Sequence, residues 1–254
     1  MGGKMRTPFV RTGQTQFYDG DISPEGLAMQ FNRGMWFGSV YGTWVDEVSG
    51  AETTATSDTF MNGIQVGARI PVGTSTLMLN AHYTDLVAGQ GRRGILWNCT
   101  ATSNACANGN TTTGAPGVGV LAYDFDDVQL AVQLNSTLAG LPFQVWAEYA
   151  QNQDPSDLNT AWAMGLFYGA AASYRTWEVG ALYQLIEKDA LFAQYIDSDF
   201  GGGTTDISGF LLRAGYAPLR NWVFNATYFI NERNVDIGPR TGYDRLQLDM
   251  NLRF

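Results

Sequence analysis

The chain has 254 residues, enough for one large all-β domain or two smaller ones, with only 15% charged residues but 30 glycines and 12 tyrosines. Its net charge of -9 and the absence of a Lys/Arg stripe argue against nucleic acid as a partner. No apolar run approaches the roughly 20 residues that a membrane-spanning helix needs, so a membrane protein with this sequence would have to be a barrel.

Residues 1–24 lack a clear hydrophobic period and are rich in turn formers, which predicts a loop or a partial strand. From residue 26 onward, short runs of alternating apolar and polar residues are separated by Gly, Asn, Asp and Pro, a pattern typical of antiparallel strands. We predict eleven strands, at residues 26–32, 35–45, 59–70, 75–84, 122–136, 142–151, 161–171, 175–186, 206–216, 221–231 and 243–254. Which face of the second strand is apolar stays undecided, because aromatic residues occur at both odd and even positions of this strand.

Two regions depart from this pattern. Residues 85–120 form the longest connection, and loops of this length without structure of their own are usually functional or disordered. In residues 122–136, Tyr123 and Phe125 change parity relative to Val128 and the residues after it. This shift favours one long strand with a bulge over two shorter strands.

The closing strand has the strictest alternation. Its two faces carry Leu246, Leu248, Met250, Leu252 and Phe254 on one side and Arg245, Gln247, Asp249, Asn251 and Arg253 on the other. Such a strand can separate a protein core from water, or lipid from a water-filled lumen.

The aromatic residues favour the second arrangement. Apolar faces repeatedly begin or end in Trp or Tyr with aliphatic residues between them, as from Trp162 to Tyr168 and from Trp222 to Tyr228. Aromatic girdles at both ends of an apolar band mark outer-membrane barrels, whereas a soluble sandwich would need buried partners for these indole and phenol groups. We therefore predict an all-β, transmembrane, antiparallel up-and-down β-barrel, with residues 1–254 as a single domain, rather than a soluble β-domain.

The connections between the predicted strands alternate between short and long. In outer-membrane barrels the short turns are periplasmic and the long loops extracellular, so the closing strand would end at the periplasmic rim. Counting back over eleven strands places the start of the first one outside. We therefore expect these 11–12 strands to be the C-terminal part of a longer barrel whose signal peptide and N-terminal strands are missing.

Few residues carry reactive chemistry. Cys99 and Cys106 could form a disulfide in an oxidising compartment or remain two free thiols. His82 is the single histidine, which argues against a Cys/His zinc site, and we expect no cofactor. Weak candidates for a calcium site, whose spacing matches no EF-hand, are Asp197, Asp199 and Asp206.

Four stretches of the chain are similar to sequences of one known family. They are residues 3–9 (GKMRTPF), 21–30 (DISPEGLAMQ), 149–152 (YAQN) and 197–206 (DSDFGGGTTD). They resemble the putative porin family of Gram-negative outer-membrane proteins, and the last stretch is the most specific. Family members carry a signal peptide and several strands before the first stretch, which this sequence lacks.

The resemblance implies a bacterial outer-membrane barrel of about sixteen strands, commonly a homotrimer, through which small hydrophilic solutes diffuse passively. It implies that outer-membrane lipid and lipopolysaccharide surround the barrel. It also implies that Phe254 is the recognition end for the outer-membrane insertion machinery.

In a porin, lumen-facing charges set the field and width of the pore. The predicted pore-lining residues are Arg69, Glu148, Glu178, Arg213, Arg245, Asp249 and Arg253. Residues 85–120 are the candidate constriction loop, with Arg92 and Arg93 as its charges, and a surface-exposed loop fits this stretch equally well.

Two other classes of function remain. A barrel enzyme would need a histidine beside a serine, and His82 stands in mid-strand where a wall residue is expected, so we predict no enzyme. A structural or adhesive barrel with a plugged pore would use acidic surface loops to bind divalent cations or to bridge lipopolysaccharide. The acidic residues predicted in those loops are Asp46, Glu47, Glu52, Asp58, Asp154, Asp157, Asp197 and Asp199.

Overall fold

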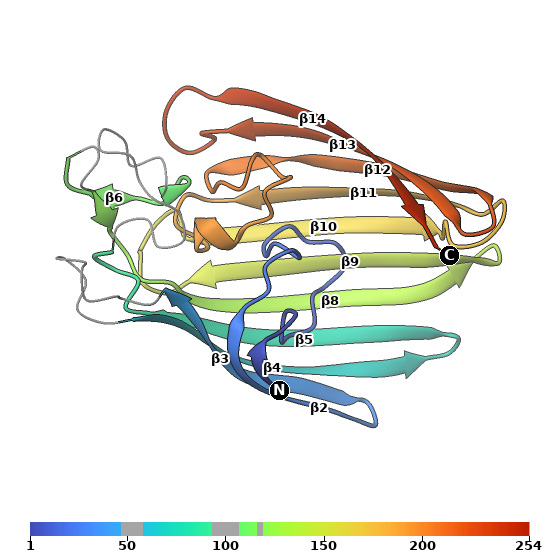
Figure 1. The fold of residues 1–254 in the computed structure, drawn as a ribbon, viewed down its shortest axis with the longest axis horizontal. Coiled ribbons are helices and arrows are strands. Elements are labelled where there is room, and N and C mark those ends of the chain that lie inside the picture. The colour runs from blue at the N-terminus through green and yellow to red at the C-terminus, as the bar shows by residue number, and fades with distance from the viewer. Residues whose placement is uncertain (47–57, 93–106, 116–118, 254) are drawn as a thin grey trace.

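The computed structural model describes residues 1–46, 58–92, 107–115 and 119–253. Within these residues, twelve strands form one antiparallel sheet that follows chain order, while β6 and β7 form a separate two-stranded sheet (Figure 1). The strands of the large sheet are β1 (Gly2–Lys4), β2 (Glu25–Arg33), β3 (Trp36–Asp46), β4 (Thr59–Val72), β5 (Ser75–Val87), β8 (Asp126–Leu138), β9 (Leu141–Asn152), β10 (Thr160–Gly169), β11 (Trp177–Ile186), β12 (Ile207–Leu219), β13 (Trp222–Arg233) and β14 (Thr241–Leu252). The predicted all-β, antiparallel up-and-down architecture is confirmed.

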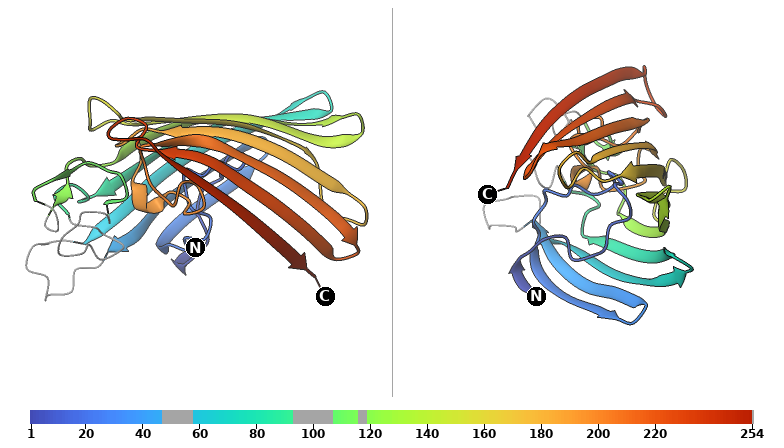
Figure 2. Two further views of the ribbon diagram at one scale, coloured as in Figure 1. Left: turned by 90° about the horizontal axis from the view of Figure 1, so that it is seen from above. Right: turned by 90° about the vertical axis from the view of Figure 1, so that its right-hand side faces the viewer.

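The sheet is strongly curved, with β1 and β14 as its two edges (Figure 2). These edges do not pair with each other, so the sheet forms an open wall. The C-terminal end of β14 lies at the end of the wall that carries the tight turns, and the longer connections gather at the opposite end (Figure 1). No helix in the described residues is long and apolar enough to cross a membrane.

The predicted bulged strand at residues 122–136 is wrong, because β8 begins only at Asp126. The Asp126 backbone N–H donates to Asn152 Oδ1 at 3.1 Å, and the Asp124 N–H donates to Asp154 Oδ2 at 3.0 Å. These side-chain acceptors occupy backbone donors that a longer strand would have given to its neighbours. The change of parity therefore marks the start of a strand, and β7 (Val120–Leu121) pairs with β6 (Thr112–Thr113) outside the large sheet.

The predicted alternation of short and long connections fails at one pair. The β9–β10 connection (residues 153–159) and the β10–β11 connection (residues 170–176) each span seven residues. The other connections alternate as expected, from the tight turn between β4 and β5 to the long segment at residues 187–206. Loop length alone therefore does not identify the end of the wall to which a connection belongs.

The convex face of the wall is apolar. It carries exposed side chains of every long strand, including Leu27, Met29, Val40, Ile64, Leu79, Leu130, Val145, Met164, Val179, Leu212, Phe224 and Leu248. Strand pairing also settles the open question in β3, where Trp36 and Trp44 lie on this face while Phe37 and Tyr41 lie on the concave face. A continuous apolar surface of this extent requires a non-aqueous neighbour.

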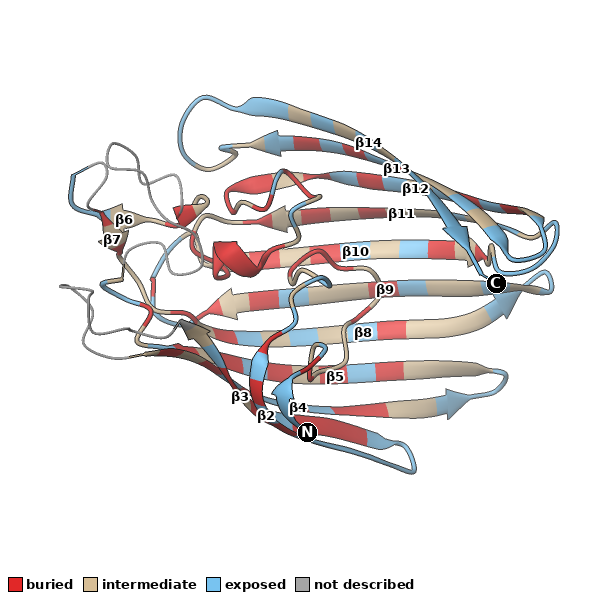
Figure 3. Cartoon of the chain, in the orientation of Figure 1, coloured by how far each residue is buried: buried red, intermediate tan, exposed pale blue. Residues whose placement is uncertain are grey.

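The concave face is covered by two stretches without regular strands. We call residues 5–24 the crossing segment and residues 187–206 the inward loop. Both lie inside the curve of the wall (Figure 2), and buried residues concentrate in them and in the wall beneath them (Figure 3). One hydrophobic cluster joins Phe17 of the crossing segment and Phe200 of the inward loop to Trp146 of β9. The core of the protein therefore lies on the concave side.

Aromatic rings of the concave face rest on glycines of the neighbouring strand. The directly paired residues are Phe37 with Gly67, Tyr41 with Gly63, and Phe167 with Gly180. A Cβ atom at Gly180 would lie 2.2 Å from two atoms of the Phe167 ring. Glycine is needed here because only its bare backbone leaves room for the ring to lie flat against the wall.

We predict that Gly180→Ala lowers the free energy of unfolding by about 1–3 kcal/mol, because the added methyl group forces the Phe167 ring out of its packed position. Denaturant titration in detergent micelles, followed by fluorescence, measures this change. Gly242→Ala in β14 is the matched control, since nothing lies within 4 Å of its new Cβ, and we expect it to be neutral or stabilising. Equal stability of the two variants would contradict the packing role of Gly180.

Candidate functional site

The crossing segment is fixed to the concave face by side-chain amides of the wall. Gln65 of β4 binds both backbone groups of Val10, accepting from its N–H at 2.8 Å and donating to its carbonyl at 2.9 Å. The Gly13 N–H donates to Gln133 Oε1 of β8 at 2.7 Å. A Cβ at Gly13 would lie 2.2 Å from the Trp146 ring, so the backbone passes directly over that side chain.

The next residues of the crossing segment reach strands further along the sheet. Thr15 Oγ1 donates to Glu148 Oε2 of β9 at 2.5 Å, and the Gln16 N–H donates to Gln184 Oε1 of β11 at 3.0 Å. Arg213 of β12 donates to Gln14 Oε1 at 3.1 Å. The contacts of residues 10–16 thus run from β4 to β12, and the segment spans most of the wall (Figure 1).

The crossing segment and the inward loop also bind each other. The Asp197 N–H donates to the Gln16 carbonyl at 3.1 Å, and the Asp19 N–H donates to the Tyr195 carbonyl at 2.7 Å. The rings of Tyr18 and Tyr195 meet edge to face with centroids 5.4 Å apart. Tyr195 ends a short 3-10 turn, η2 (Ala193–Tyr195), whose residues are all buried. The two stretches therefore form one unit on the concave face.

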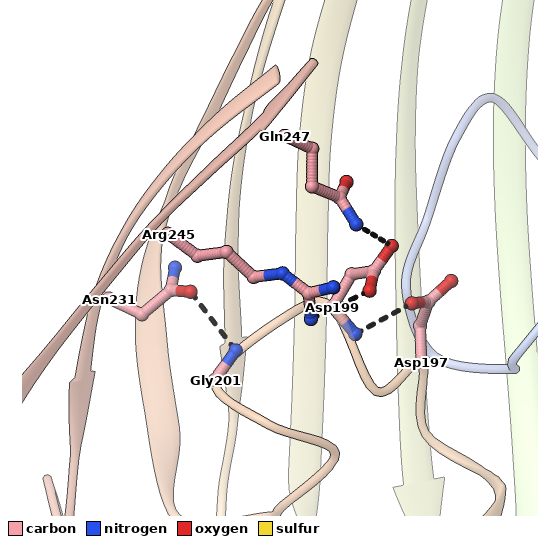
Figure 4. Close-up of polar contacts among 6 residues, drawn as sticks. All are labelled: Asp197, Asp199, Gly201, Asn231, Arg245 and Gln247. Carbon is pink, nitrogen blue, oxygen red and sulfur yellow. Dashed lines mark hydrogen bonds and ion pairs between the residues drawn. The ribbon is translucent and has the colours of Figure 1, made fainter. Parts of the chain in front are cut away.

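The inward loop is tied to the last strands of the wall through Asp199 (Figure 4). Its carboxylate forms an ion pair with Arg245 of β14 at 2.8 Å and accepts from Gln247 Nε2 at 2.7 Å. The Gly201 N–H donates to Asn231 Oδ1 of β13 at 3.1 Å. Gly201 and the two glycines after it have positive φ angles, which allow the sharp bend that brings the loop back to the wall.

Burial changes the acidity of one carboxyl group in this unit. Desolvation, with smaller contributions from the charges of Asp19 and Asp199, raises the pKa of Asp197 to about 6. The Asp199 N–H donates to Asp197 Oδ1 at 3.0 Å and Arg11 is nearby, and both act in the opposite direction. Burial also raises the pKa of the Tyr18 phenol, so this ring stays neutral.

The structure places the predicted pore-lining residues on the concave face and brings several of them into pairs. Glu178 and Arg213 form an ion pair at 3.4 Å, and Arg245 pairs with the inward loop. The guanidinium of Arg69 lies 4.2 Å from the centre of the Phe37 ring. Glu148, Asp249 and Arg253 also lie on the concave face. Glu148 lies beneath the crossing segment, and Arg253 is exposed at the end of β14.

Part of the predicted constriction loop can be placed. The Arg92 N–H donates to the Gly89 carbonyl at 3.2 Å, and the Arg92 carbonyl accepts from Leu121 at 2.7 Å, whereas Arg93, Cys99 and Cys106 lie outside the described residues. Asn110 donates to the carbonyls of Lys188 and Leu191 at 2.9 and 3.0 Å. The described part of this loop therefore supports the inward loop. The concave face of the wall is covered by the crossing segment instead. Phe254 also lies outside the described residues.

The three weak calcium candidates have separate partners. Asp197 caps the Asp199 N–H, Asp199 pairs with Arg245, and Asp206 accepts from the Asp236 N–H at 2.6 Å. Among the described residues, no group of three or more His, Cys, Asp or Glu side chains is arranged to hold a metal ion. His82 is buried in the wall, where Nε2 lies 2.9 Å from the Tyr41 hydroxyl and Nδ1 lies 3.4 Å from Gln129 Oε1.

The anchoring glutamines were not among the predicted site residues. Gln65, Gln133 and Gln184 look like ordinary polar positions of alternating strands, and their partners lie 55 to 168 residues away along the chain. The signal that could have found the crossing segment is its own composition. Residues 12–16 (TGQTQ) are small or amide-bearing, as a backbone that must lie against a polar wall requires.

The space around the crossing segment is uneven. Beneath it, between β4 and β9, only a small cavity of about 50 Å³ remains, lined by His82, Asp127 and Glu148 among others. Beside it, against β12–β14, lies an open polar hollow of about 390 Å³. The segment therefore fills the concave side of the middle strands and leaves room next to the last three.

Comparison with known proteins identifies the family of this chain. The family model described as putative porin matches residues 117–254, which is more than half of the chain and includes β8–β14 and the inward loop. A comparison with curated proteins finds no match. The convex face is apolar and the concave face carries the charges and amides of the wall, which agrees with the family match, and the chain belongs to the putative porin family.

Proposed function

We propose that this protein is a porin of the bacterial outer membrane that lets small hydrophilic solutes diffuse passively through a lumen narrowed by the crossing segment. The observation that carries the proposal is the difference between the two faces of the wall. The convex face is apolar, whereas the concave face carries amides and charges among its buried apolar side chains, and a hydrogen-bonded segment lies across it. A wall of this kind separates lipid from water in outer-membrane barrels.

Aromatic contacts at both ends of the convex face support the membrane location. Toward the end with the long connections, the rings of Trp162, Tyr183 and Phe210 are in contact, with centroid distances of 5.2 and 4.8 Å. Toward the end with the tight turns, Tyr168 and Trp177 meet at 5.6 Å. Two aromatic levels separated by aliphatic side chains fit the interfaces on either side of a hydrocarbon layer.

The crossing segment supports a narrowed lumen rather than a wide one. Its backbone is irregular, and irregular backbone at membrane depth is tolerated only where protein or water satisfies its polar groups. Here the wall amides do so. The same observation also favours the second candidate, a structural barrel whose pore is plugged, and only transport measurements separate the two.

We predict that the folded protein produces ohmic single-channel steps in planar lipid bilayers, because the hollow beside the crossing segment is open and polar. The sample is the full-length protein, because the open wall formed by the described part of residues 1–254 does not enclose a pore by itself. Its folding is verified by heat-dependent electrophoretic mobility. The heat-denatured protein is the control. Absence of steps from the folded sample would refute the porin and favour the plugged barrel.

We predict that Gln65→Ala increases the unitary conductance and its fluctuations, because Val10 loses both hydrogen bonds to the wall and the crossing segment loosens. Each lost bond costs on the order of 1–3 kcal/mol when its partner stays buried. Gln144→Ala is the matched control, since Gln144 binds Asn135 of the wall at 2.9 Å and we expect no change in conductance. Steps in Gln65→Ala alone, and none in the unaltered protein, would identify a plugged barrel.

The pKa of Asp197, at the junction of the crossing segment and the inward loop, predicts a pH dependence. An acid whose pKa is raised in the folded state binds its proton more tightly there, so the free energy of unfolding falls as pH rises from about 4 to about 6 and then levels off. Denaturation midpoints at pH 5 and pH 8 measure this difference. Asp197→Asn should reduce the difference between the two midpoints. Asp244→Asn, which removes an exposed carboxyl group of β14, should leave that difference unchanged. Equal pH responses of both variants would exclude Asp197 as the cause.

A further inference from the structure

The hollow beside the crossing segment is lined mainly by amides and hydroxyl groups. Its polar walls come from the crossing segment on one side and from β13 and β14 on the other, namely Gln14, Gln16, Asn225, Thr227, Gln247 and Asn251. At about 390 Å³ it is several times larger than the cavity of about 50 Å³ beneath the segment. A hydrated solute therefore finds room on this side of the segment and not under it.

Most charges around the hollow are neutralised in pairs. Asp199, on its lining, binds Arg245 at 2.8 Å, and Arg213, also on its lining, binds Glu178 at 3.4 Å. Each pair has no net charge, so its field falls off quickly with distance. These four residues hold the inward loop and the wall in place and contribute little to the potential in the hollow.

Asp249 is the exception. It lines the same hollow from the middle of β14, directly opposite Asn225 of β13 in the strand register. Its side chain is exposed, and it takes part in none of the ion pairs formed among the described residues. Among the charged residues that line the hollow, Asp249 is therefore the one outside an ion pair, while Arg213, which also donates to Asn225 Oδ1 at 3.4 Å, is held by Glu178.

We propose that solutes pass between residues 14–16 and the β12–β14 part of the wall, and that Asp249 gives this passage a preference for cations. The inference rests on the proposed porin function and adds the position of the path and the class of ion that it favours. Neutral hydrophilic solutes pass as well, because amide and hydroxyl groups exchange hydrogen bonds with them without a charge requirement.

Two basic residues of the same face, Arg245 and Arg253, each lie four residues from Asp249, and both are too far away to cancel this charge. Arg245 is also held by Asp199 at 2.8 Å. Arg253 lies four residues beyond Asp249, about 13 Å along an extended strand. At physiological ionic strength the screening length is about 8 Å, so the field of Arg253 is largely screened at Asp249. The low-dielectric wall behind Asp249 focuses its field into the hollow.

The test is the reversal potential of the intact protein in planar bilayers under a potassium chloride gradient. We expect the unaltered protein to favour potassium over chloride. Asp249→Asn should move the reversal potential toward zero, and Asp249→Lys should reverse its sign. Asp244→Asn is the matched control, because it removes the same charge from the same strand but at a position paired with the convex-face residue Ile230, and it should leave the reversal potential unchanged.

The outcomes separate this inference from the function on which it rests. Ohmic steps with a chloride preference, or with equal reversal potentials for Asp249→Asn and Asp244→Asn, would overturn the role of Asp249 and leave the porin intact. A complete lack of steps in the unaltered, folded protein would overturn both. Heat-dependent electrophoretic mobility confirms that each variant is folded before it is measured.

Discussion

The two-residue period of one continuous antiparallel ladder controls this structure. From β2 to β14 each long strand of the large sheet pairs with its neighbours, so the register of one strand fixes the faces of the next. A slip of one residue would move every leucine of β14 to the polar side and every charge to the apolar side. The apolar convex face, the polar concave face and the stretches packed on it all depend on this register.

The concave face has a second requirement, because the crossing segment brings irregular backbone against it. Buried N–H and C=O groups need partners, and a strand's own backbone groups are already used by the sheet. Side chains must therefore supply them, and Gln65 does so for both groups of Val10. A glutamine offers a donor and an acceptor without charge, which a carboxylate or an ammonium group does not. This explains why amides rather than charges anchor the segment.

The sequence predicted the fold more completely than the site. Alternation located all eleven long strands, because a residue's face depends only on its immediate neighbours. It failed in β3, where only pairing with β4 shows that Trp36 faces outward and Phe37 inward. It also failed at Asp126, where a side-chain acceptor helps to set the start of β8. Alternation could not locate the crossing segment, since the segment has no hydrophobic period and its anchors lie 55 to 199 residues away. The length of residues 85–120 instead favoured that loop as the constriction.

The position of the crossing segment changes which charges of the concave face stay accessible. A segment running down the centre of a pore would expose the whole wall to solute, and selectivity would reflect the balance of all charges. This segment lies against β4–β11 and covers Glu148, so that carboxyl group contacts Thr15 instead of the passage. The Glu178–Arg213 and Asp199–Arg245 pairs neutralise three more of the predicted pore-lining charges, namely Glu178, Arg213 and Arg245. The predicted pore-lining residues, four basic and three acidic, are nearly balanced in number, but packing leaves a local imbalance among the charges that stay accessible.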